Sequence, residues 1–382
     1  MKVKPPTSEA ALVPFAGLLA ALYQIPDPRR RQGQRYNLAH LLLFAVLAIL
    51  AGATSYRRIR LFIGAHRERL NATFGARFRR TPAVNTLRVL LHALDPAAIE
   101  AAFRRHAKHL GDTATPPGRR VIALDGKTLR GSFDHLDDQA AAQVLSAFAS
   151  EAALILAHQE IAEGDEIAAA QALIEQLGLS GILFTADALH CQKTFAAAAT
   201  GNALLVRVKD NQPRLLESLA GWCAVQAPTN HLDTVDRHTH GREEHRRVEV
   251  FAAADCLDPD WRPLIACVVR VTRRTLCRDT RTGLWRQRRE VAYYASQIPL
   301  DAPACATAIR GHWGIENRNH HVRDRTLGED ASRIRRKPGI VARLRSFALN
   351  ILRAHGVTNV SEALYTNALS LDHLLNYGLS KS

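Results

Sequence analysis

The sequence predicts a mixed α/β protein with a helical N-terminal region and a β-rich segment in its second half. Apolar residues recur at helical spacing through residues 1–112. Within residues 119–212, short apolar runs typical of buried strands come first, and amphipathic helices then alternate with further strands. Residues 213–295 alternate apolar and polar as strands do, residues 296–356 return to helical spacing, and residues 357–382 form a C-terminal tail.

The N-terminal region contains four segments with helical periodicity, separated by glycine and proline. These segments are residues 15–25, 38–53, 56–74 and 86–110. The second is almost wholly apolar, but it is shorter than a membrane span and arginines follow it closely, which favours a buried core helix. Clusters of arginine occupy the polar faces, and repeated clusters of one sign favour contact with phosphates over simple solvation. The clearest cluster is Arg57, Arg58 and Arg60.

The central part is predicted to contain strands at residues 121–124, 144–148 and 154–158, a helix at 166–177, a strand at 181–186, a helix at 193–199 and a strand at 203–208. The β-rich segment is predicted to contain strands at residues 248–253, 264–272 and 290–294. Helices are predicted at residues 304–322 and 341–355.

Composition limits the class of protein and of partner. The chain has 382 residues, of which 47% are hydrophobic and 23% charged, and this excludes a disordered or fibrous protein. Its net charge of +15 favours a polyanionic partner such as nucleic acid. A GC-rich genome also produces chains rich in alanine and arginine, and this is the alternative explanation. The scattered cysteines and the polar start of the chain favour a cytoplasmic protein with reduced thiols.

Two acidic residues follow short apolar strands directly. Asp125 comes after the run that begins at residue 121, and Asp187 comes after the run that begins at residue 181. If these strands are neighbours, the two carboxylates lie close together and need a cation between them. Hard oxygen ligands favour Mg²⁺ or Mn²⁺. An acid in this position can equally be a turn residue or a helix N-cap.

A third acidic residue, Glu316, lies in a predicted helix among polar side chains. Helical spacing places His312 and His320 four residues from it on either side, and Arg323 seven residues after it. An acid surrounded by imidazole and guanidinium groups is unusual on a solvated helix. The alternative is a simple electrostatic stripe with Trp313 buried.

Four motifs together resemble DDE insertion-sequence transposases, in the subgroup that includes the H-repeat-associated proteins. The motifs are Val121–Ser132, Ala186–Lys193, Val208–Pro213 and His312–Asn317. Pro26–Gly33 and Gly328–Arg335 are similar to segments of that subgroup too, so the resemblance extends from about Phe15 to His355.

This resemblance implies an RNase H-like catalytic core in which Asp125, Asp187 and Glu316 hold two Mg²⁺ or Mn²⁺ ions. It implies cleavage of the terminal repeats of a mobile DNA element and their transfer to target DNA, with a homodimer in the synaptic complex. No membrane and no small-molecule cofactor is expected, and residues 213–295 correspond to an insertion. The candidates for DNA-contacting or supporting residues are Lys127, Lys209, Asn211, Gln212, His312, Asn317, Arg323, Arg57, Arg58 and Arg60.

The chain departs from the subgroup pattern near Glu316. Asn319 and His321 stand where the subgroup has Leu and Trp, and Leu327 stands where it has Phe. Two alternatives therefore stay open. One is a decayed or repurposed DNA-binding protein without catalysis, and the other is a metal-dependent nuclease that cleaves DNA without strand transfer.

Overall fold

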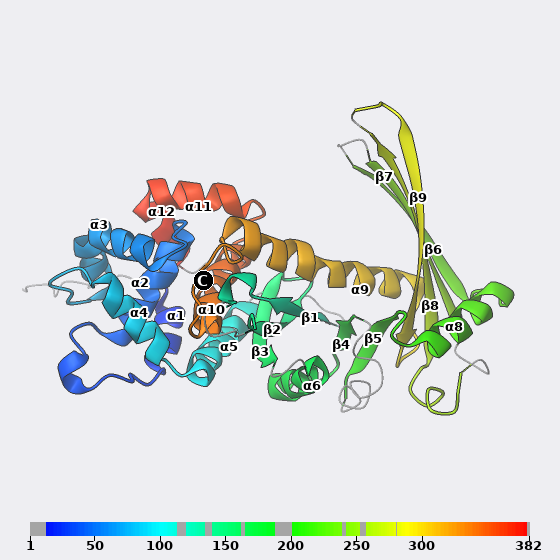
Figure 1. Cartoon of the computed structure of the whole chain (residues 1–382), viewed down its shortest axis with the longest axis horizontal. Helices are drawn as coiled ribbons and strands as arrows, with labels where there is room; N and C mark the ends of the chain where they lie inside the picture. Colours follow the sequence, from blue (N-terminus) through cyan, green and yellow to red (C-terminus); the bar gives the residue numbers. More distant parts are fainter. Residues whose placement is uncertain are drawn as a thin grey trace, which may run out of the picture.

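The computed structural model describes residues 13–112, 120–133, 140–161, 165–187, 201–238, 242–252, 257–279 and 281–379. The chain is a mixed α/β protein with a helical region at one end and a large sheet beside it (Figure 1). Within these described residues, the sheet has nine strands in the order β3-β2-β1-β4-β5-β9-β8-β7-β6. The β-rich segment therefore continues the sheet of the central part and does not form a separate sheet.

Helices from both ends of the chain make up the helical region. The N-terminal helices are α1 (Ala16–Tyr23), α2 (Leu38–Leu50), α3 (Tyr56–Phe74), α4 (Val84–Ala93) and α5 (Pro96–Asp112). The C-terminal helices are α10 (Pro338–Ala354), α11 (Val360–Leu369) and α12 (Leu371–Asn376). The predicted helix 86–110 is two helices, because Pro96 starts a new one and the Asp95 carboxylate accepts hydrogen bonds from the first backbone amides of α5.

Helix α2 is the core of this region, and all 13 of its residues are buried. Among the described residues, one segment, 31–50, is long and apolar enough to cross a membrane, but 72% of it is buried inside the protein. The residues expected to be a simple C-terminal tail instead form α11 and α12, which pack onto the N-terminal helices. Asn367 of α11 donates a 2.9 Å hydrogen bond to the carbonyl of Leu50.

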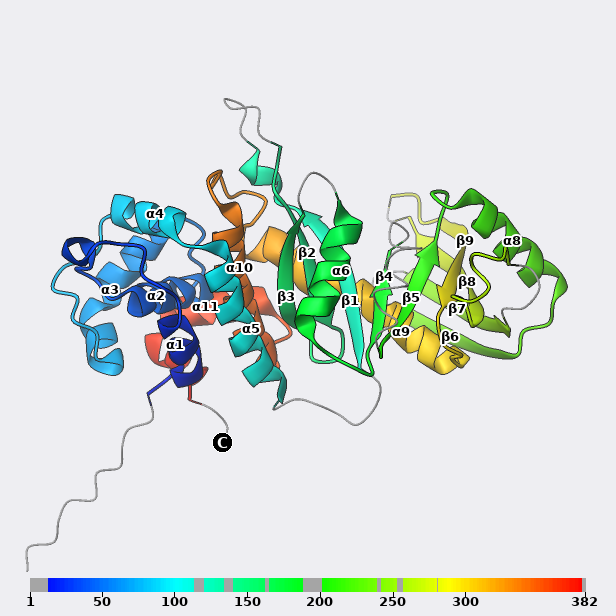
Figure 2. The ribbon, with the colours of Figure 1, turned by 90° about the horizontal axis from the view of Figure 1, so that it is seen from below.

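The central part supplies five strands. They are β1 (Val121–Thr128), β2 (Gln143–Ala149), β3 (Leu154–Ile161), β4 (Leu183–Ala186) and β5 (Ala203–Val208). β1, β2 and β3 are antiparallel neighbours, whereas β4 and β5 run parallel to β1. Helix α6 (Glu166–Leu177) covers one face of the sheet and α9 (Ala302–Gly314) covers the other (Figure 2). The predicted bounds of α6 and β5 are confirmed, while the predicted helix 193–199 lies outside the described residues.

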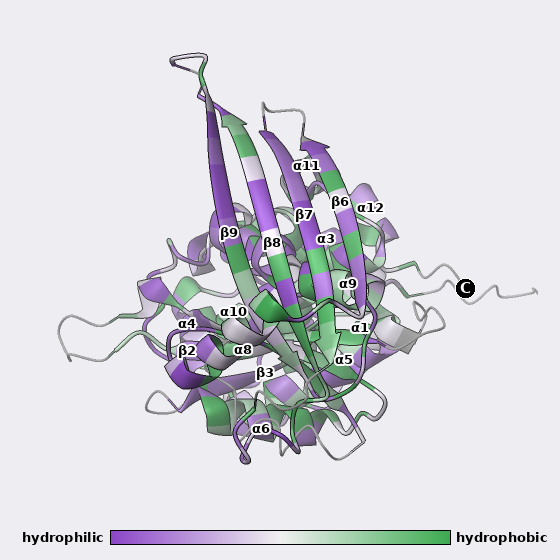
Figure 3. Cartoon of the chain, turned by 90° about the vertical axis from the view of Figure 1, so that its right-hand side faces the viewer, coloured by the Kyte–Doolittle hydropathy of each residue, from purple (hydrophilic) through white to green (hydrophobic). Residues whose placement is uncertain are grey.

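The β-rich extension is larger than the sequence pattern indicated. It contains β6 (Asn230–His238), β7 (Arg242–Ala252), β8 (Cys267–Arg278) and β9 (Trp285–Ser296), and it also contains α8 (Pro213–Val225). The sequence analysis predicted neither α8 nor β6. The outer halves of β7, β8 and β9 are mostly hydrophilic (Figure 3), so their pairing rather than an apolar pattern defines them as strands.

A buried carboxylate connects the helical region to the sheet. Glu100 of α5 accepts hydrogen bonds from the backbone amide of His158 in β3 and from Nε of Arg343 in α10, each at 2.7 Å. Their exposed fractions are 6% for Glu100, 1% for His158 and 3% for Arg343. Beside them, Asn350 of α10 bonds to both the amide and the carbonyl of Ile155, at 2.9 and 2.7 Å, and so pairs with the edge strand β3 as a neighbouring strand would.

This buried network predicts loss of stability in acid. Burial acts to raise the pKa of Glu100, but His158 and Arg343 outweigh it and lower this pKa to about 2. Burial lowers the pKa of His158 to about 4 against the opposing effect of Glu100. In the unfolded chain the histidine takes up its proton near pH 6.5 and the carboxyl near pH 4.5. Because the unfolded state binds more protons in this range, the folded state loses stability as the pH falls.

We expect the free energy of unfolding to fall by about 3 kcal/mol between pH 7 and pH 4 through His158 alone. Urea unfolding at several pH values measures this loss. The His158→Gln variant, which keeps a polar side chain without a titrating group, should lose less stability over the same pH range. An equal loss in the variant would contradict this assignment.

Candidate active site

The sheet brings Asp125 and Asp187 to corresponding positions on neighbouring strands. β1 and β4 run parallel, with Leu124 paired to Ala186, and each aspartate is the next residue along its strand. The side chains are partly exposed, at 19% for Asp125 and 44% for Asp187. The strands that precede the two aspartates are therefore neighbours, which is the arrangement under which the two carboxylates were expected to lie close together.

Helix α9 carries the chain across the sheet to Glu316. Asp301 caps its first turn by accepting a 2.8 Å hydrogen bond from the amide of Ala304. Gly311 lets the helix approach the sheet closely, since a Cβ there would lie 2.9 Å from the Cβ of Ser150. Beyond Gly314 the helix widens into two π-helical turns, Ile315–His320 and Val322–Thr326. Such turns are frequent at functional sites, and no pattern in the amino-acid sequence predicts them.

Asp125, Glu316 and His320 form a compact cluster of possible metal ligands. One ligand atom of each lies within 4.8 Å of the others. His320 Nδ1 lies 3.3 Å from Asp125 Oδ2 and 3.8 Å from Glu316 Oε2. The hydrogen bond from His320 lowers the pKa of Glu316, against the opposing effect of burial. Burial acts to lower the pKa of His320, but its bonds to the two carboxylates outweigh this effect and raise it.

Asp187 lies outside this cluster and forms an ion pair with Lys209. His312 connects the two parts of the site, because its Nδ1 lies 3.0 Å from Oγ1 of Thr185 in β4. Burial lowers the pKa of His312, and all three acids, Asp125, Asp187 and Glu316, act in the opposite direction. The imidazole of His312 is therefore within electrostatic reach of each of them.

Two of the predicted supporting residues lie beneath the surface. Lys127 pairs with Asp324 and lies 3.7 Å from Glu329 and 3.9 Å from Asp330, with its side chain 6% exposed. Arg323 is 1% exposed and donates a 2.9 Å hydrogen bond to Glu329. Burial raises the pKa of Asp324, although Lys127 opposes this effect. Lys127 therefore ties β1 to the segment after Glu316, and Arg323 joins two parts of that segment to each other.

The other predicted residues lie at the surface or close to it. Asn317 is exposed and donates a 3.3 Å hydrogen bond to the carbonyl of Trp313. Asn211 is exposed, and Gln212 directly precedes α8. Three arginines at the start of α3 are all exposed: Arg57, Arg58 and Arg60.

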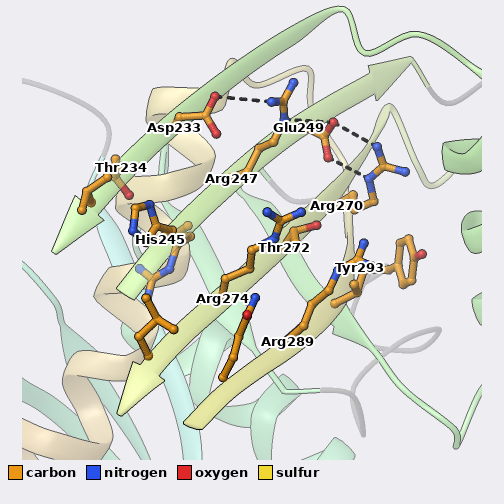
Figure 4. A pocket seen from close by; sticks show the side chains of 15 residues that line it. Asp233, Thr234, His245, Arg247, Glu249, Arg270, Thr272, Arg274, Arg289 and Tyr293 are labelled. Atoms are coloured by element: carbon orange, nitrogen blue, oxygen red, sulfur yellow. Dashed lines mark hydrogen bonds and ion pairs between the residues drawn. The ribbon is translucent and has the colours of Figure 1, made fainter. Parts of the chain in front are cut away.

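The extension carries basic surfaces that the sequence analysis did not single out. A hollow of about 610 Å³ on its outer face is lined by arginines from β7, β8 and β9 (Figure 4). Carboxylates balance part of this charge, since Glu249 accepts hydrogen bonds from Arg270 at 2.7 and 2.9 Å. On the opposite face, the guanidinium of Arg273 lies 5.3 Å from the ring centre of Trp313, which is 43% exposed. The alternative with a buried Trp313 is therefore wrong.

Asn319 is a poor fit to its surroundings. Its side chain is fully buried, and neither its amide nitrogen nor its carbonyl oxygen has a hydrogen-bond partner in the described part of the chain. A buried polar group without a partner costs about 1–3 kcal/mol. We expect Asn319→Leu, which introduces the residue typical of the subgroup, to raise the free energy of unfolding by about that amount. Chemical denaturation measures the change, and an unchanged or lower stability would show that the amide has a partner in solution.

Comparison with known proteins identifies the family. The family described as "Transposase DDE domain" matches residues 116–352, and the family "DDE_Tnp_1-associated" matches residues 19–107. The chain is 31% identical to "Putative transposase YncI" of Escherichia coli O157:H7, over 88% of this chain and 87% of that protein. It is 30% identical to "H repeat-associated putative transposase YhhI" of Escherichia coli (strain K12), over 86% of this chain and 88% of that protein.

A further relative is "Putative protein YbfL" of Escherichia coli (strain K12), which is 31% identical over 86% of this chain and 88% of that protein. The family match spans more than half of the chain and includes all three acids of the site. The chain belongs to the DDE-domain transposase family, in the subgroup of the H repeat-associated proteins.

Proposed function

We propose that this chain binds the terminal repeats of a mobile DNA element and catalyses metal-dependent cleavage and strand transfer. The observation that carries the proposal is that Asp125 and Glu316 lie together in one cluster, while Asp187 follows the strand next to that of Asp125. Asp125 and Asp187 come from adjacent parallel strands, and Glu316 comes from the helix that crosses them. The order and directions of the first five strands, β3-β2-β1-β4-β5, support an RNase H-like core.

The residues present fit a divalent cation of the Mg²⁺ class. Two carboxylates and one imidazole have ligand atoms within 4.8 Å of one another, and a third carboxylate follows the neighbouring strand. We infer that Asp125, Asp187 and Glu316 would hold two ions, with His320 in contact with two of these acids. Bound ions of this class activate a water or a 3′-hydroxyl and stabilise the leaving oxygen of a phosphodiester.

The chain's own residues position these acids. His320 bridges the Asp125 and Glu316 carboxylates, so the π-helical turn and β1 keep a fixed relation. His312 ties the last turn of α9 to β4 through Thr185. Lys209 neutralises Asp187 in the absence of other cations. Preorganised groups of this kind cost little reorganisation when a substrate binds.

DNA is the partner that the charge of the chain favours. The net charge is +15, and the start of α3 presents three exposed arginines. We propose a homodimer when two DNA ends are held together and a cytoplasmic location, with no membrane partner and no small-molecule cofactor. The burial of α2 inside the helical region supports its role as a core helix.

The triad assignment predicts loss of cleavage without loss of binding. We expect Asp125→Asn and Glu316→Gln to abolish cleavage of a duplex that carries the terminal repeats, because each removes a negatively charged oxygen ligand. Binding to the same duplex should change little. The assay compares Mg²⁺, Mn²⁺ and a chelator, and Glu217→Gln on the exposed face of α8 is the matched control. Cleavage at the wild-type rate in either site variant would exclude the assignment.

Two alternatives give different results in this assay. A decayed or repurposed DNA-binding protein would bind the duplex and cleave it with neither metal, and the unpartnered Asn319 beside Glu316 is the observation in its favour. A nuclease would cleave the duplex but would not join the 3′-hydroxyl to target DNA.

The arginines of α3 predict a salt-dependent contribution to binding. Replacing Arg57, Arg58 and Arg60 by alanine should weaken DNA binding and flatten the plot of log K against log salt concentration by up to about 3 units, since each lost phosphate contact removes about 0.9. Fluorescence anisotropy titrations from low to moderate salt measure the slope. The triple lysine variant keeps the charges and should keep the slope. An unchanged slope in the alanine variant would remove this surface from the DNA interface.

A further inference from the structure

A second hollow, of about 660 Å³, lies between the helical region and the loop that follows the Glu316 helix. Three parts of the chain form it. They are the turn that leads into α3, the outer side of α4, and the loop of residues 328–336. Gly328–Arg335, which supplies most of this loop, is similar in sequence to a segment of the subgroup.

The lining of this hollow is strongly basic. Four of its twelve described lining residues are arginine, and none of the twelve carries a carboxylate. The arginines are Arg88, Arg333, Arg335 and Arg336. The hollow on the extension differs in this respect, because Asp233 and Glu249 are among its lining residues and pair with its arginines. Of these two hollows, only the one beside α3 therefore concentrates positive charge without opposing acids in its described lining.

The electrostatic effect of this lining is visible at His92. This residue lies in the last turn of α4 and lines the hollow. Burial is the largest cause that lowers its pKa, and Arg88, Arg336 and Lys337 lower it further. Arg88 donates a 2.8 Å hydrogen bond to the Asn85 amide, which is a neutral partner and leaves the charge of the guanidinium uncompensated.

The start of α3 adds to the positive potential. Ser55 caps this 19-residue helix, and Ser55 and Tyr56 line the hollow. The first backbone amides of a helix and its dipole attract anions. Arg57, Arg58 and Arg60 follow at the start of the same helix, so the hollow is continuous along the chain with the exposed basic surface described above.

Contacts at both ends hold the loop in place. Lys337, whose φ of 46° is rare for a residue other than glycine, donates a 2.8 Å hydrogen bond from Nζ to the carbonyl of Leu94. At the other end, Gly328 approaches Thr54 so closely that a Cβ on Gly328 would lie 3.1 Å from Thr54 Cγ2. The arginines between these points therefore start from a preorganised arrangement.

The same loop contacts the catalytic strand. Asp330 lies 3.9 Å from Lys127, which is two residues after Asp125 in β1. The loop is thus shared between the candidate active site on one side and the basic hollow on the other.

We propose that this hollow binds a backbone phosphodiester of the same DNA duplex whose scissile phosphate is placed at Asp125, Asp187 and Glu316. The proposal rests on the proposed function, and it assigns Arg333 and Arg336 to the phosphate. These residues are positioning residues, since they hold the DNA and take no part in the bond changes. The chemistry of recognition is that of arginine with phosphate oxygens.

The first test measures the salt dependence of binding to the terminal-repeat duplex and to a random-sequence duplex of equal length. The Arg333→Ala/Arg336→Ala variant should lose about 1–2 units of slope, which corresponds to one or two phosphates. The Arg333→Lys/Arg336→Lys variant should keep most of it. The matched control is Arg214→Ala/Arg262→Ala, which removes two exposed arginines from the extension. An equal loss of slope in the control variant would overturn the proposal, because the loss would then follow from the lower net charge of the protein and not from a contact in the hollow.

The second test locates the contact on the DNA. Single phosphates of the duplex are replaced in turn by uncharged methylphosphonates, and the affinity of each duplex is measured. Wild-type protein should bind at least one substituted duplex about 3- to 10-fold more weakly, and the alanine variant should bind that duplex as it binds unmodified DNA. A variant as sensitive as wild type at every position would overturn the proposal.

These results separate the proposal from the proposed function. If Glu316→Gln loses cleavage while the hollow variant keeps its slope, the catalytic assignment stands and the hollow proposal fails. If no metal supports cleavage but the hollow variant loses slope on either duplex, the proposed catalysis fails and the phosphate site stands. Binding of inorganic phosphate alone, without an effect on either duplex, would also overturn the proposal as stated. Absence of binding to both duplexes would overturn both.

Discussion

The burial of one carboxylate, that of Glu100, is the interaction on which the arrangement of this protein depends. A charge removed from water is stable only when it is paired and hydrogen-bonded, and Glu100 satisfies this through β3 on one side and α10 on the other. The hydrogen bond between the His158 amide and the Glu100 carboxylate therefore holds the helical region to the edge strand β3. Its loss leaves the buried negative charge of Glu100 with fewer partners. Every site that uses residues from both parts, the basic hollow included, depends on that connection.

The sequence predicted the central part of the fold better than the extension, and the reason is physical. Short buried strands such as β4 and β5 are continuous apolar runs, and α6 has an apolar stripe with Asp165 as its cap. The outer strands of the extension are polar on both faces, and long antiparallel pairing defines them. β6 lies at the edge of the sheet and pairs with β7 alone among the described strands. Its nine residues show no regular alternation of apolar and polar side chains, so the sequence pattern does not indicate a strand there.

The candidate site was predictable where it depended on strand ends and unpredictable where it depended on distant charges. The equivalent positions of Asp125 and Asp187 follow from two apolar runs, and the contact of His320 with Glu316 follows from a spacing of four residues. The burial of Lys127 and Arg323 could not be foreseen, because both pair with acids that follow Glu316 in the chain and that no motif connected to them. The π-helical turns depend on the fit of the helix against the sheet and have no local signature.

The distribution of acids explains why a basic chain has such unequal surfaces. In the segment after Glu316, the acids Asp324, Glu329 and Asp330 all turn toward Lys127, Arg323 and Arg345 beneath the surface. Because these acids pair with cations of the interior, Arg333 and Arg336, which follow them in the chain, face a hollow without a carboxylate in its described lining. The same ion pairs that hold the segment after Glu316 thus leave a basic surface beside it. Stability of the candidate active site and attraction for a polyanion are two consequences of this pairing.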